Sequence, residues 1–426
     1  MKICLINPRH EESLDPNLDV PLGILYIATI LKNINYDVMV LDLSFYDRNI
    51  WESVIPYADI YGITILTASF HRSMIIRDIC KKINPKSKII AGGAHSSALP
   101  EETSKEFDIV CVGDGEGIIQ DIIKYIEINN DSNLAFPKIF DGNKKLMDIN
   151  EIPFPARELV PIEKYTRLVN GDKATSIITS RGCIYRCSFC QNSMRKEKVR
   201  FRTIDNIIRE IKELILKYNY KTLIFYDDNI TTRPDFVQLL KEIKKLNIIF
   251  RCNGDARKNN KELFQKLYDS GCREICFGIE SGSQKILDKI NKKVTVEQNR
   301  IAIIEAKKAG LNVKAFLILG SPGESWDTVK ETVEFMQKTR PQYWTLFQLI
   351  PLPGCELYEN PEKYGIKIIT KDWRQYYNIA GQNEGGLVCE TEFMTIEELA
   401  KARQYVIRNL PGQSGPLQDY YKKLNK

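Results

Sequence analysis

The feature that most constrains the fold of this chain is the alternation of short apolar segments with segments of helical periodicity. In residues 1–128, five apolar segments, from "KICLINP" to "FDIVCVGDGEG", alternate with helical segments such as "PLGILYIATILKN". Strands that read as continuous apolar runs are buried on both faces and usually belong to a parallel sheet. This part of the chain therefore predicts an α/β domain of the doubly wound, flavodoxin-like type, with ligands at the carboxyl ends of its strands.

The same alternation returns in residues 173–359, where six strand-and-helix units follow one another. A closed TIM barrel needs eight such units, so we expect a partial, open (β/α)6 barrel. Residues 129–172 are rich in Asn, Asp and Pro, and we expect a linker that packs across the barrel. Residues 360–426 contain one helical segment, "IEELAKARQYVIRNL", and are expected to form a small helical cap over the barrel mouth.

The composition is that of an ordinary globular protein and excludes several classes of function. The formal net charge is +6, but Lys and Arg are spread along the whole sequence and are not concentrated as in a nucleic-acid-binding protein. No apolar run approaches the roughly 18 residues of a membrane span, and the N-terminus lacks the apolar core of a signal peptide. We therefore expect a cytoplasmic protein with no nucleic-acid partner and no membrane span.

The chain has 11 cysteines, an odd number. Without a secretion signal, this number predicts a reducing compartment and unpaired thiols. Most of them lie inside apolar segments and are expected to be small buried hydrophobic residues: Cys4, Cys80, Cys111, Cys252, Cys272, Cys276, Cys355 and Cys389.

The other three cysteines, Cys183, Cys187 and Cys190, are spaced Cys-x3-Cys-x2-Cys after the first barrel strand. Three buried structural thiols are disfavoured by neighbouring charges such as Arg181 and Arg186. A structural zinc ion needs four ligands, and no other Cys or His lies within 50 residues on either side. A [4Fe–4S] cluster is held by thiolates, and three thiolates leave one iron open to a substrate or cofactor. The spacing therefore favours an iron–sulfur cluster but does not by itself name the molecule that binds the open iron.

This spacing, with the aromatic Phe189 just before the third cysteine, resembles the signature of the radical S-adenosylmethionine (SAM) superfamily. The resemblance implies that the amino and carboxylate groups of SAM chelate the open iron. It also implies that an electron from the cluster cleaves SAM to a 5′-deoxyadenosyl radical, which abstracts hydrogen from an unactivated carbon. An electron donor such as flavodoxin or ferredoxin is then required.

Further motifs of the superfamily recur at the expected strand ends: "YDDN", "CNGDAR", "GIESGS" and "LILGSPGES". The resemblance implies that SAM is bound by Phe189, Asp228, Arg257, Glu280, Ser281 and Gly320. In "YDDN", Asp228 is the first choice for the SAM amino group, with Asp227 second. Each side chain also has a structural interpretation, because aspartates occur in turns, glutamate can cap a helix, and arginine can be a surface charge. Their shared position at strand ends favours the SAM site.

The N-terminal domain resembles the cobalamin-binding domain that precedes many radical SAM barrels, through "PLGILYIATIL", "GGAHSSALPEE", "DIVCVGDGEG" and "IPFPARELVP". Its implied cobalamin contacts are Thr64, Thr67, Ser69, Gly92, Gly93, Gly113 and Glu116. The Asp-x-His-x-x-Gly motif that supplies a histidine to cobalt is absent. His10 has Pro8 two residues before it, where the motif has Asp, and Ser13 three residues after it, where the motif has Gly. We therefore expect cobalt without a protein histidine. The alternative is a domain that has lost cobalamin and only shapes the substrate cavity.

Together these features predict a cobalamin-dependent radical SAM methyltransferase of class B that acts on a small molecule, a peptide or a lipid. Two alternatives stay open: a radical SAM enzyme of the same architecture that performs cyclisation, carbon–carbon coupling or rearrangement, and a non-catalytic corrinoid-binding protein. Five aromatic residues near the end of the barrel either line a substrate pocket or belong to the core: Tyr343, Trp344, Trp373, Tyr376 and Tyr377.

Overall fold

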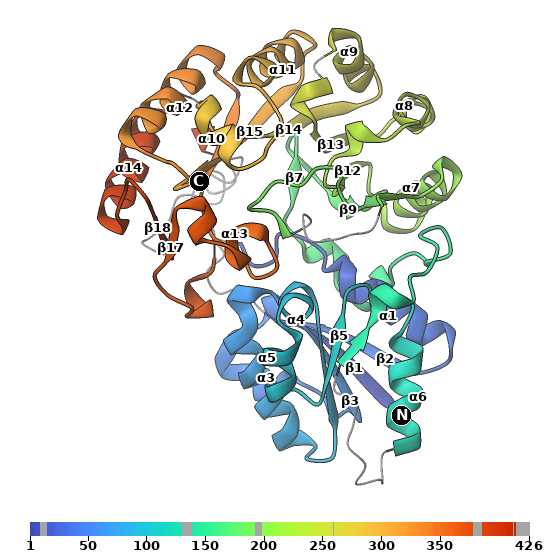
Figure 1. The fold of residues 1–426 in the computed structure, drawn as a ribbon. Coiled ribbons are helices and arrows are strands. Elements are labelled where there is room, and N and C mark those ends of the chain that lie inside the picture. The colour runs from blue at the N-terminus through green and yellow to red at the C-terminus, as the bar shows by residue number, and fades with distance from the viewer. Residues whose placement is uncertain are drawn as a thin grey trace. The chain divides into compact units, whose positions relative to one another are not determined.

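The computed structural model describes residues 1–8, 15–129, 139–191, 198–258, 260–377, 386–411 and 413–414. The chain divides into two compact units, Met1–Thr166 and Arg167–Lys426, which we call the first and the second unit. Each is built on its own parallel sheet with helices around it (Figure 1). The predicted class, a doubly wound domain followed by a partial, open barrel, is confirmed.

The first unit contains a six-stranded sheet in the order β2-β1-β3-β4-β5-β6, and every neighbouring pair is parallel. Its strands are β1 (Lys2–Asn7), β2 (Asp37–Asp42), β3 (Ile60–Thr64), β4 (Lys88–Gly92), β5 (Ile109–Val112) and β6 (Ile139–Asp141). From β1 the chain adds β2 on one side and then β3 to β6 on the other, so the strand order reverses between β1 and β3. This is the switch point where doubly wound folds bind ligands.

Helices cover both faces of this sheet, and their buried side chains are those that the apolar periodicity indicates. The helices are α1 (Leu22–Asn33), α2 (Trp51–Val54), α3 (Phe70–Ile83), α4 (Ala94–Ala98), α5 (Pro100–Glu106) and α6 (Ile119–Asn129). Ala28 and Leu31 of α1 share one core cluster with Ile122 and Ile126 of α6. On the other side, Phe70 at the start of α3 contacts the rings of His95 and Phe107.

The segment expected to be a linker, residues 129–172, is divided between the two units. Its described residues up to Thr166 belong to the first unit, and those from Arg167 on belong to the second. β6 adds a sixth strand to the sheet that we expected to have five. Further on, the Ala156 amide donates to the Leu25 carbonyl at 3.2 Å, and the Tyr165 hydroxyl donates to the Asp42 carboxylate at 2.6 Å. The Pro-rich composition therefore gave no indication that Ala156 and Tyr165 are hydrogen-bonded to elements of the first unit.

The second unit contains a seven-stranded parallel sheet in the order β19-β16-β15-β14-β13-β12-β9. Its strands are β9 (Thr175–Ile177), β12 (Thr222–Phe225), β13 (Ile249–Gly254), β14 (Cys272–Glu280), β15 (Asn312–Leu319), β16 (Tyr343–Gln348) and β19 (Gln413–Ser414). The first six are the six predicted strands. Since β9 and β19 stand at opposite ends of this order, the described sheet is open, as expected of a partial barrel.

Helices follow the strands on the outside of the curved sheet (Figure 1). They are α7 (Ile204–Tyr218), α8 (Phe236–Lys244), α9 (Lys261–Asp269), α10 (Gln284–Lys289), α11 (Val296–Lys308) and α12 (Trp326–Thr339). α7 begins after Thr203, whose hydroxyl accepts a bond from the Asn206 amide, and it ends at Asn219 in the left-handed conformation. Its apolar stripe, including Ile207 and Ile211, is buried.

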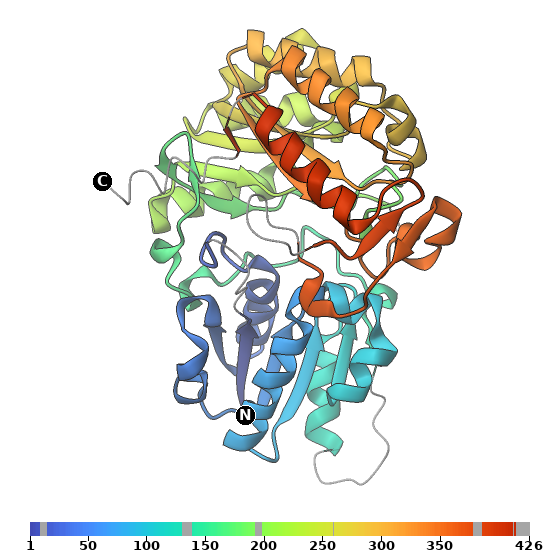
Figure 2. The same ribbon diagram turned by 90° about the vertical axis from the view of Figure 1, so that its left-hand side faces the viewer.

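The C-terminal segment contains the expected helix, α14 (Ile396–Asn409), which packs along α12 (Figure 2). Trp326 and Tyr405 meet edge to face between the two helices. Before it come α13 (Glu356–Glu359) and the antiparallel pair β17 (Ile366–Ile368) and β18 (Cys389–Thr391). Of the five aromatic residues near the barrel end, Trp344 and Tyr376 are buried in the core.

Two general expectations are tested directly by the structure. All 11 cysteines lie within the described residues, and none forms a disulfide bond. Among the helices of the described part of the chain, none has both the length and the apolar character needed to cross a membrane.

Candidate active site

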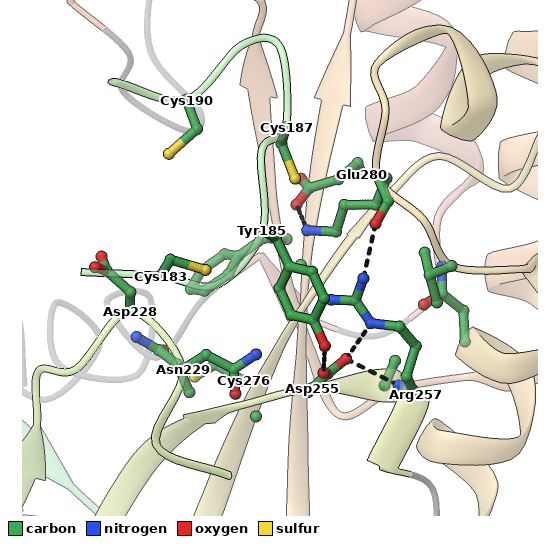
Figure 3. Close-up of a pocket in the computed structure, with 18 of the residues that line it drawn as sticks. Cys183, Tyr185, Cys187, Cys190, Asp228, Asn229, Asp255, Arg257, Cys276 and Glu280 are labelled. Atoms are coloured by element: carbon green, nitrogen blue, oxygen red, sulfur yellow. Dashed lines mark hydrogen bonds and ion pairs between the residues drawn. The ribbon is translucent and has the colours of Figure 1, made fainter. Parts of the chain in front are cut away.

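A cavity of about 230 Å³ lies at the carboxyl ends of the second-unit strands (Figure 3). Cys183, Cys187 and Cys190 line it from one loop, with Phe189 beside them. From the strand ends come Asp228, Arg257 and Glu280. The structure therefore brings seven of the nine residues predicted for the cluster and SAM to one place.

The cysteine loop is fixed by backbone bonds to neighbouring elements. The Ser188 amide donates to the Ile290 carbonyl at 3.0 Å, and the Ser188 carbonyl accepts from the Leu357 amide of α13 at 3.0 Å. The Gln191 side chain donates to the Pro353 carbonyl at 2.8 Å. The three thiols are therefore presented by a loop whose shape is set on both sides by the second unit.

The two aspartates of "YDDN" have different surroundings. Asp227 is fully buried, and its carboxylate accepts from the Thr179 amide at 3.0 Å and the Ser180 hydroxyl at 2.6 Å. Burial raises the pKa of Asp227 to about 6, although these hydrogen bonds favour the charged form. Asp227 thus supports the strand end that leads into the cysteine loop, whereas Asp228 lines the cavity next to Cys183 (Figure 3).

The donor set of the cavity fits a cluster better than a single metal ion. Burial raises the pKa of the Cys183 and Cys187 thiols, and the nearby Lys292 ammonium opposes that shift at Cys187. Across the described residues, no three His, Cys, Asp or Glu side chains gather around one point as ligands of one ion. A cubane cluster binds each thiolate through a different iron, so it needs thiols spread along one wall of a cavity, as they are here.

Glu280 forms a buried ion pair with Lys292, with 2.6 Å between Oε1 and Nζ. Glu280 stands at an irregularity in the pairing of β14 with β15 and has φ of 60°, a rare conformation for a residue other than glycine. Burial alone would lower the pKa of Lys292, but the Glu280 carboxylate and the Cys187 sulfur raise it. The bulge re-aims the glutamate, so that its carboxylate enters the cavity.

Three contacts with neighbouring residues fix the Arg257 side chain in the cavity wall. Its guanidinium pairs with Asp255 at 2.7 Å, donates to the Lys292 carbonyl at 2.9 Å, and lies 3.3 Å from the ring centre of Tyr185. The Tyr185 hydroxyl donates to the other Asp255 oxygen (Figure 3). Arg257 is therefore a fixed cation beside the cluster loop and not a solvated surface charge.

Two predicted SAM contacts do not line the cavity. The Ser281 hydroxyl lies 3.0 Å from that of Thr332 and accepts from the Ser283 amide at 3.1 Å, at the start of α10. Gly320 has φ of 85°, and a Cβ there would lie 2.6 Å from the Gln348 amide nitrogen. Close packing explains both residues, because each is in contact with a neighbouring element rather than with the cavity.

Sequence reasoning missed several residues of the cavity. Lys292 comes from the turn after α10, Asn299 comes from α11, and Asn253 comes from the end of β13. Cys276, expected to be an inert buried thiol, lines the cavity and accepts from Arg251 at 3.1 Å. Its position two residues before Gly278 on β14 was the available signal, because alternate strand residues share a face.

In the first unit, the glycines at the end of β4 have unequal roles. Gly93 has φ of 95°, and a Cβ there would lie 2.8 Å from the Ile65 carbonyl oxygen, so the fold itself requires glycine. A Cβ on Gly92 would approach only Cys111, at 3.9 Å. Close packing within the first unit therefore does not require glycine at position 92, and the backbone there has no side chain over it.

The other residues predicted to contact cobalamin are mostly engaged within the first unit. Ser69 accepts from the Leu66 amide at 3.0 Å, and Thr67 is buried beside His95. A Cβ on Gly113 would lie 2.1 Å from the Asn143 side-chain oxygen, so this glycine leaves room for the turn that follows β6. Thr64 and Glu116 lie at the same carboxyl-end edge, with Glu116 buried.

The histidines bear on the predicted absence of a cobalt ligand. His95 has no exposed surface, stacks 4.5 Å from Phe70, and has its pKa lowered to about 4 by burial. His71 is exposed on α3. His10 lies outside the described residues. The buried, neutral His95 ring therefore packs in the core of the first unit.

Two family sequence models match the chain. The model of the Radical SAM superfamily matches residues 177–336, and that of the B12 binding domain matches residues 18–123. The chain is therefore a radical SAM enzyme with an N-terminal B12-binding domain. Its cofactors are a [4Fe–4S] cluster, SAM and cobalamin.

Among the relatives, an uncharacterized methyltransferase from Pyrococcus horikoshii is 28% identical, covering 89% of this chain and 87% of its own length. An anaerobic magnesium-protoporphyrin IX monomethyl ester cyclase from Rubrivivax gelatinosus is 25% identical, covering 84% of this chain and 68% of its own length. The solved structure of the radical SAM methyltransferase TsrM from Kitasatospora setae, with cobalamin and [4Fe–4S] cluster bound, shares the fold. Its TM-score is 0.72 at 15% identity, and the match covers 97% of this chain and 91% of that one. The Radical SAM match over residues 177–336 indicates an enzyme and not a non-catalytic corrinoid-binding protein.

Proposed function

We propose that this protein methylates a carbon atom of a small-molecule substrate by cobalamin-dependent radical SAM chemistry. The observation that carries the proposal is the cavity in which three thiols of one loop face charged side chains of both signs. The B12-binding match in residues 18–123 supplies the second half of the argument. When bound, the cluster and SAM supply the radical that activates the substrate carbon, and cobalamin supplies the methyl group.

The charged side chains of the cavity are assigned to different groups of SAM according to their sign. SAM carries an amino group, a carboxylate and a sulfonium, so a matching cavity needs both anions and cations. We assign Asp228 and Glu280 to the cationic end of the ligand, and Arg257 and Lys292 to its carboxylate. In the structure the Glu280 carboxylate and the Lys292 ammonium lie 2.6 Å apart, so each compensates the charge of the other.

Apolar and amide side chains of the cavity complete the assignment. Phe189 and Phe316 offer apolar surface, and Asn229 and Asn253 offer donors and acceptors suited to a ribose or a base. Cys183, Cys187 and Cys190 would hold the cluster. Because the Cys183 and Cys187 thiols have raised pKa values, cluster assembly must release protons from them.

Cobalamin would bind at the carboxyl ends of β3, β4 and β5 in the first unit. Gly92 supports this assignment, since its bare backbone is left unexplained by packing. His95 is buried in the core, so we propose that no histidine of the described residues binds the cobalt.

The test needs no knowledge of the substrate. Protein reconstituted anaerobically is given reduced cobalamin, SAM and an excess of dithionite to reduce the cluster, and the products are separated by mass spectrometry. We expect S-adenosylhomocysteine and methylcobalamin in equal amounts, together with 5′-deoxyadenosine that disappears in the variant with all three cluster cysteines changed to Ala. Absence of methylcobalamin would refute methyl transfer.

The cyclase among the relatives supports a second candidate, in which the same architecture forms a ring without methyl transfer. That enzyme would release 5′-deoxyadenosine and bind cobalamin, but it would form no S-adenosylhomocysteine. The product ratio therefore separates the two candidates.

A further inference from the structure

We propose that the outer face of the cysteine loop is the docking surface for an acidic ferredoxin that delivers the electron to the cluster. The surface, which we call the basic loop face, consists of Ile184, Arg186, Lys258, Lys289 and Lys293, all exposed. The inference rests on the proposed function, because only a cluster at Cys183, Cys187 and Cys190 needs an electron there.

The loop turns two side chains outward while its thiols face the cavity. Ile184, next to Cys183, is 55% exposed although it is a large apolar residue. The Arg186 guanidinium lies across the loop and donates to the Cys183 carbonyl at 3.0 Å. A protein that contacts these two side chains lies against the loop that carries the three thiols, which suits electron transfer to a cluster held there.

Hydrogen bonds of the turn after α10 connect Lys289 and Lys293 to the same loop. The Asn291 side chain donates to the Arg186 carbonyl at 2.7 Å, and Ile290 accepts from the loop at Ser188. Lys289 and Lys293 flank this contact. Lys258 follows Arg257 in the sequence, and the Arg257 guanidinium donates to the Lys293 carbonyl at 3.1 Å, which connects Lys258 to the same turn.

The charge of this face is not neutralised by the protein. Behind it, Lys292 pairs with Glu280 and Arg257 pairs with Asp255. Within the described parts of the chain, Lys289 and Lys293 form no ion pair. Residues 284–293 contain four lysines and one acidic residue. Exposed unpaired cations around one exposed isoleucine match an acidic protein with a small apolar contact at the centre of its interface.

The size and chemistry of the face favour a ferredoxin over a nucleic acid. Electron-transfer complexes use small, polar interfaces that form and separate quickly. A nucleic-acid site would need an extended basic stripe with exposed aromatic rings for stacking, and here the exposed apolar residue is Ile184. In the step itself, one electron leaves the reduced ferredoxin and enters the oxidised cluster, and no bond or proton is exchanged.

The experiment compares two charge-reversal variants of the reconstituted full chain. Lys289→Glu/Lys293→Glu changes the basic loop face, and Lys212→Glu/Lys241→Glu makes the same charge change at exposed positions of α7 and α8. Reduction of the cluster by a reduced plant-type ferredoxin is followed by stopped-flow absorbance at low and at high salt. We expect the first variant to react about tenfold more slowly at low salt and to lose most of the salt dependence of the wild type. The control variant should change the rate by less than about twofold.

SAM cleavage driven by dithionite separates this proposal from the proposed function. It should be equal in wild type and both variants, because the small reductant needs no docking surface. Its absence in the wild type would refute the cluster and not the docking face. Equal ferredoxin rates in wild type and the first variant, or an equal loss in the control, would overturn the docking face. So would RNA binding, measured by fluorescence anisotropy, that the first variant alone abolishes.

Discussion

At the scale of single residues, Glu280 and Lys292 depend on each other because the Lys292 side chain, 16% exposed, forms an ion pair with the buried Glu280 carboxylate in the cavity wall. Removing one member of such a pair leaves an uncompensated charge, which costs about 3–5 kcal/mol. We expect Lys292→Ala to lower the free energy of unfolding by about this amount and to weaken SAM binding by at least tenfold, roughly the loss of one charged contact.

A double variant separates the structural from the binding role of this pair. Glu280→Gln/Lys292→Met removes both charges, so it should recover most of the stability in urea denaturation and still bind SAM weakly by equilibrium dialysis. Exposed Lys293 supplies the control, since Lys293→Ala should change neither quantity. Wild-type SAM affinity in the double variant would remove the pair from the binding site.

Asp227 makes stability depend on pH. Its folded pKa of about 6 lies above the ordinary 3.8, so between these values the folded state holds a proton that the unfolded state has lost. The free energy of unfolding must then fall as pH rises from about 4 to about 6, by about 3 kcal/mol from this group. Asp227→Asn cannot titrate, and we expect its unfolding curve to lack this part of the pH dependence.

Urea denaturation of both proteins at several pH values tests this, because other buried acids contribute equally to each. Glu324, whose pKa burial raises to about 7, has the same sign and cancels in the comparison. Parallel pH profiles for the two proteins would show that Asp227 is already charged at low pH in the folded state.

At the scale of elements, the turn from β4 to α4 separates two glycines that the sequence presents as equivalent. Gly93→Ala should destabilise the first unit, because its Cβ meets the Ile65 backbone in a left-handed conformation. A Cβ at Gly92 would meet no atom closer than 3.9 Å, so we expect Gly92→Val to leave the melting temperature within a few degrees, roughly the effect of 1 kcal/mol or less. We expect Gly92→Val to reduce cobalamin retention after gel filtration. Full retention by a folded Gly92→Val variant would move the corrin away from this turn.

The elements themselves were predictable where periodicity and caps agree. The stripe of α7, with Thr203 before it, illustrates this, since local sequence determines both the buried face and the first turn. β6 was missed because three residues carry too little pattern to indicate a strand. Lys292 was missed because it comes from a turn whose position depends on how β14 and α10 fold back, a tertiary property that strand-end motifs do not contain.

The site residues divide in the same way. The cysteines were predictable from spacing, because one loop carries all three. Asp227 and Asp228 have the same chemistry and adjacent positions, and only burial distinguishes the structural residue from the one in the cavity. Ser281 and Gly320 match a motif but are used for packing against Thr332 and Gln348.

At the scale of the whole molecule, the cluster and cobalamin are assigned to different compact units, each with its own sheet and core. A substitution in one unit should therefore remove one cofactor and spare the other. We expect the variant with Cys183, Cys187 and Cys190 changed to Ala to lose its iron and keep about one corrinoid per chain, because all three thiols belong to the second unit. Gly92→Val should do the reverse. Iron analysis and the corrin absorbance of the same gel-filtered samples provide both numbers, and circular dichroism confirms that each variant is folded. Loss of both cofactors from both variants would mean that one cofactor is retained only in the presence of the other, and the assignment of each to a separate unit would then be wrong.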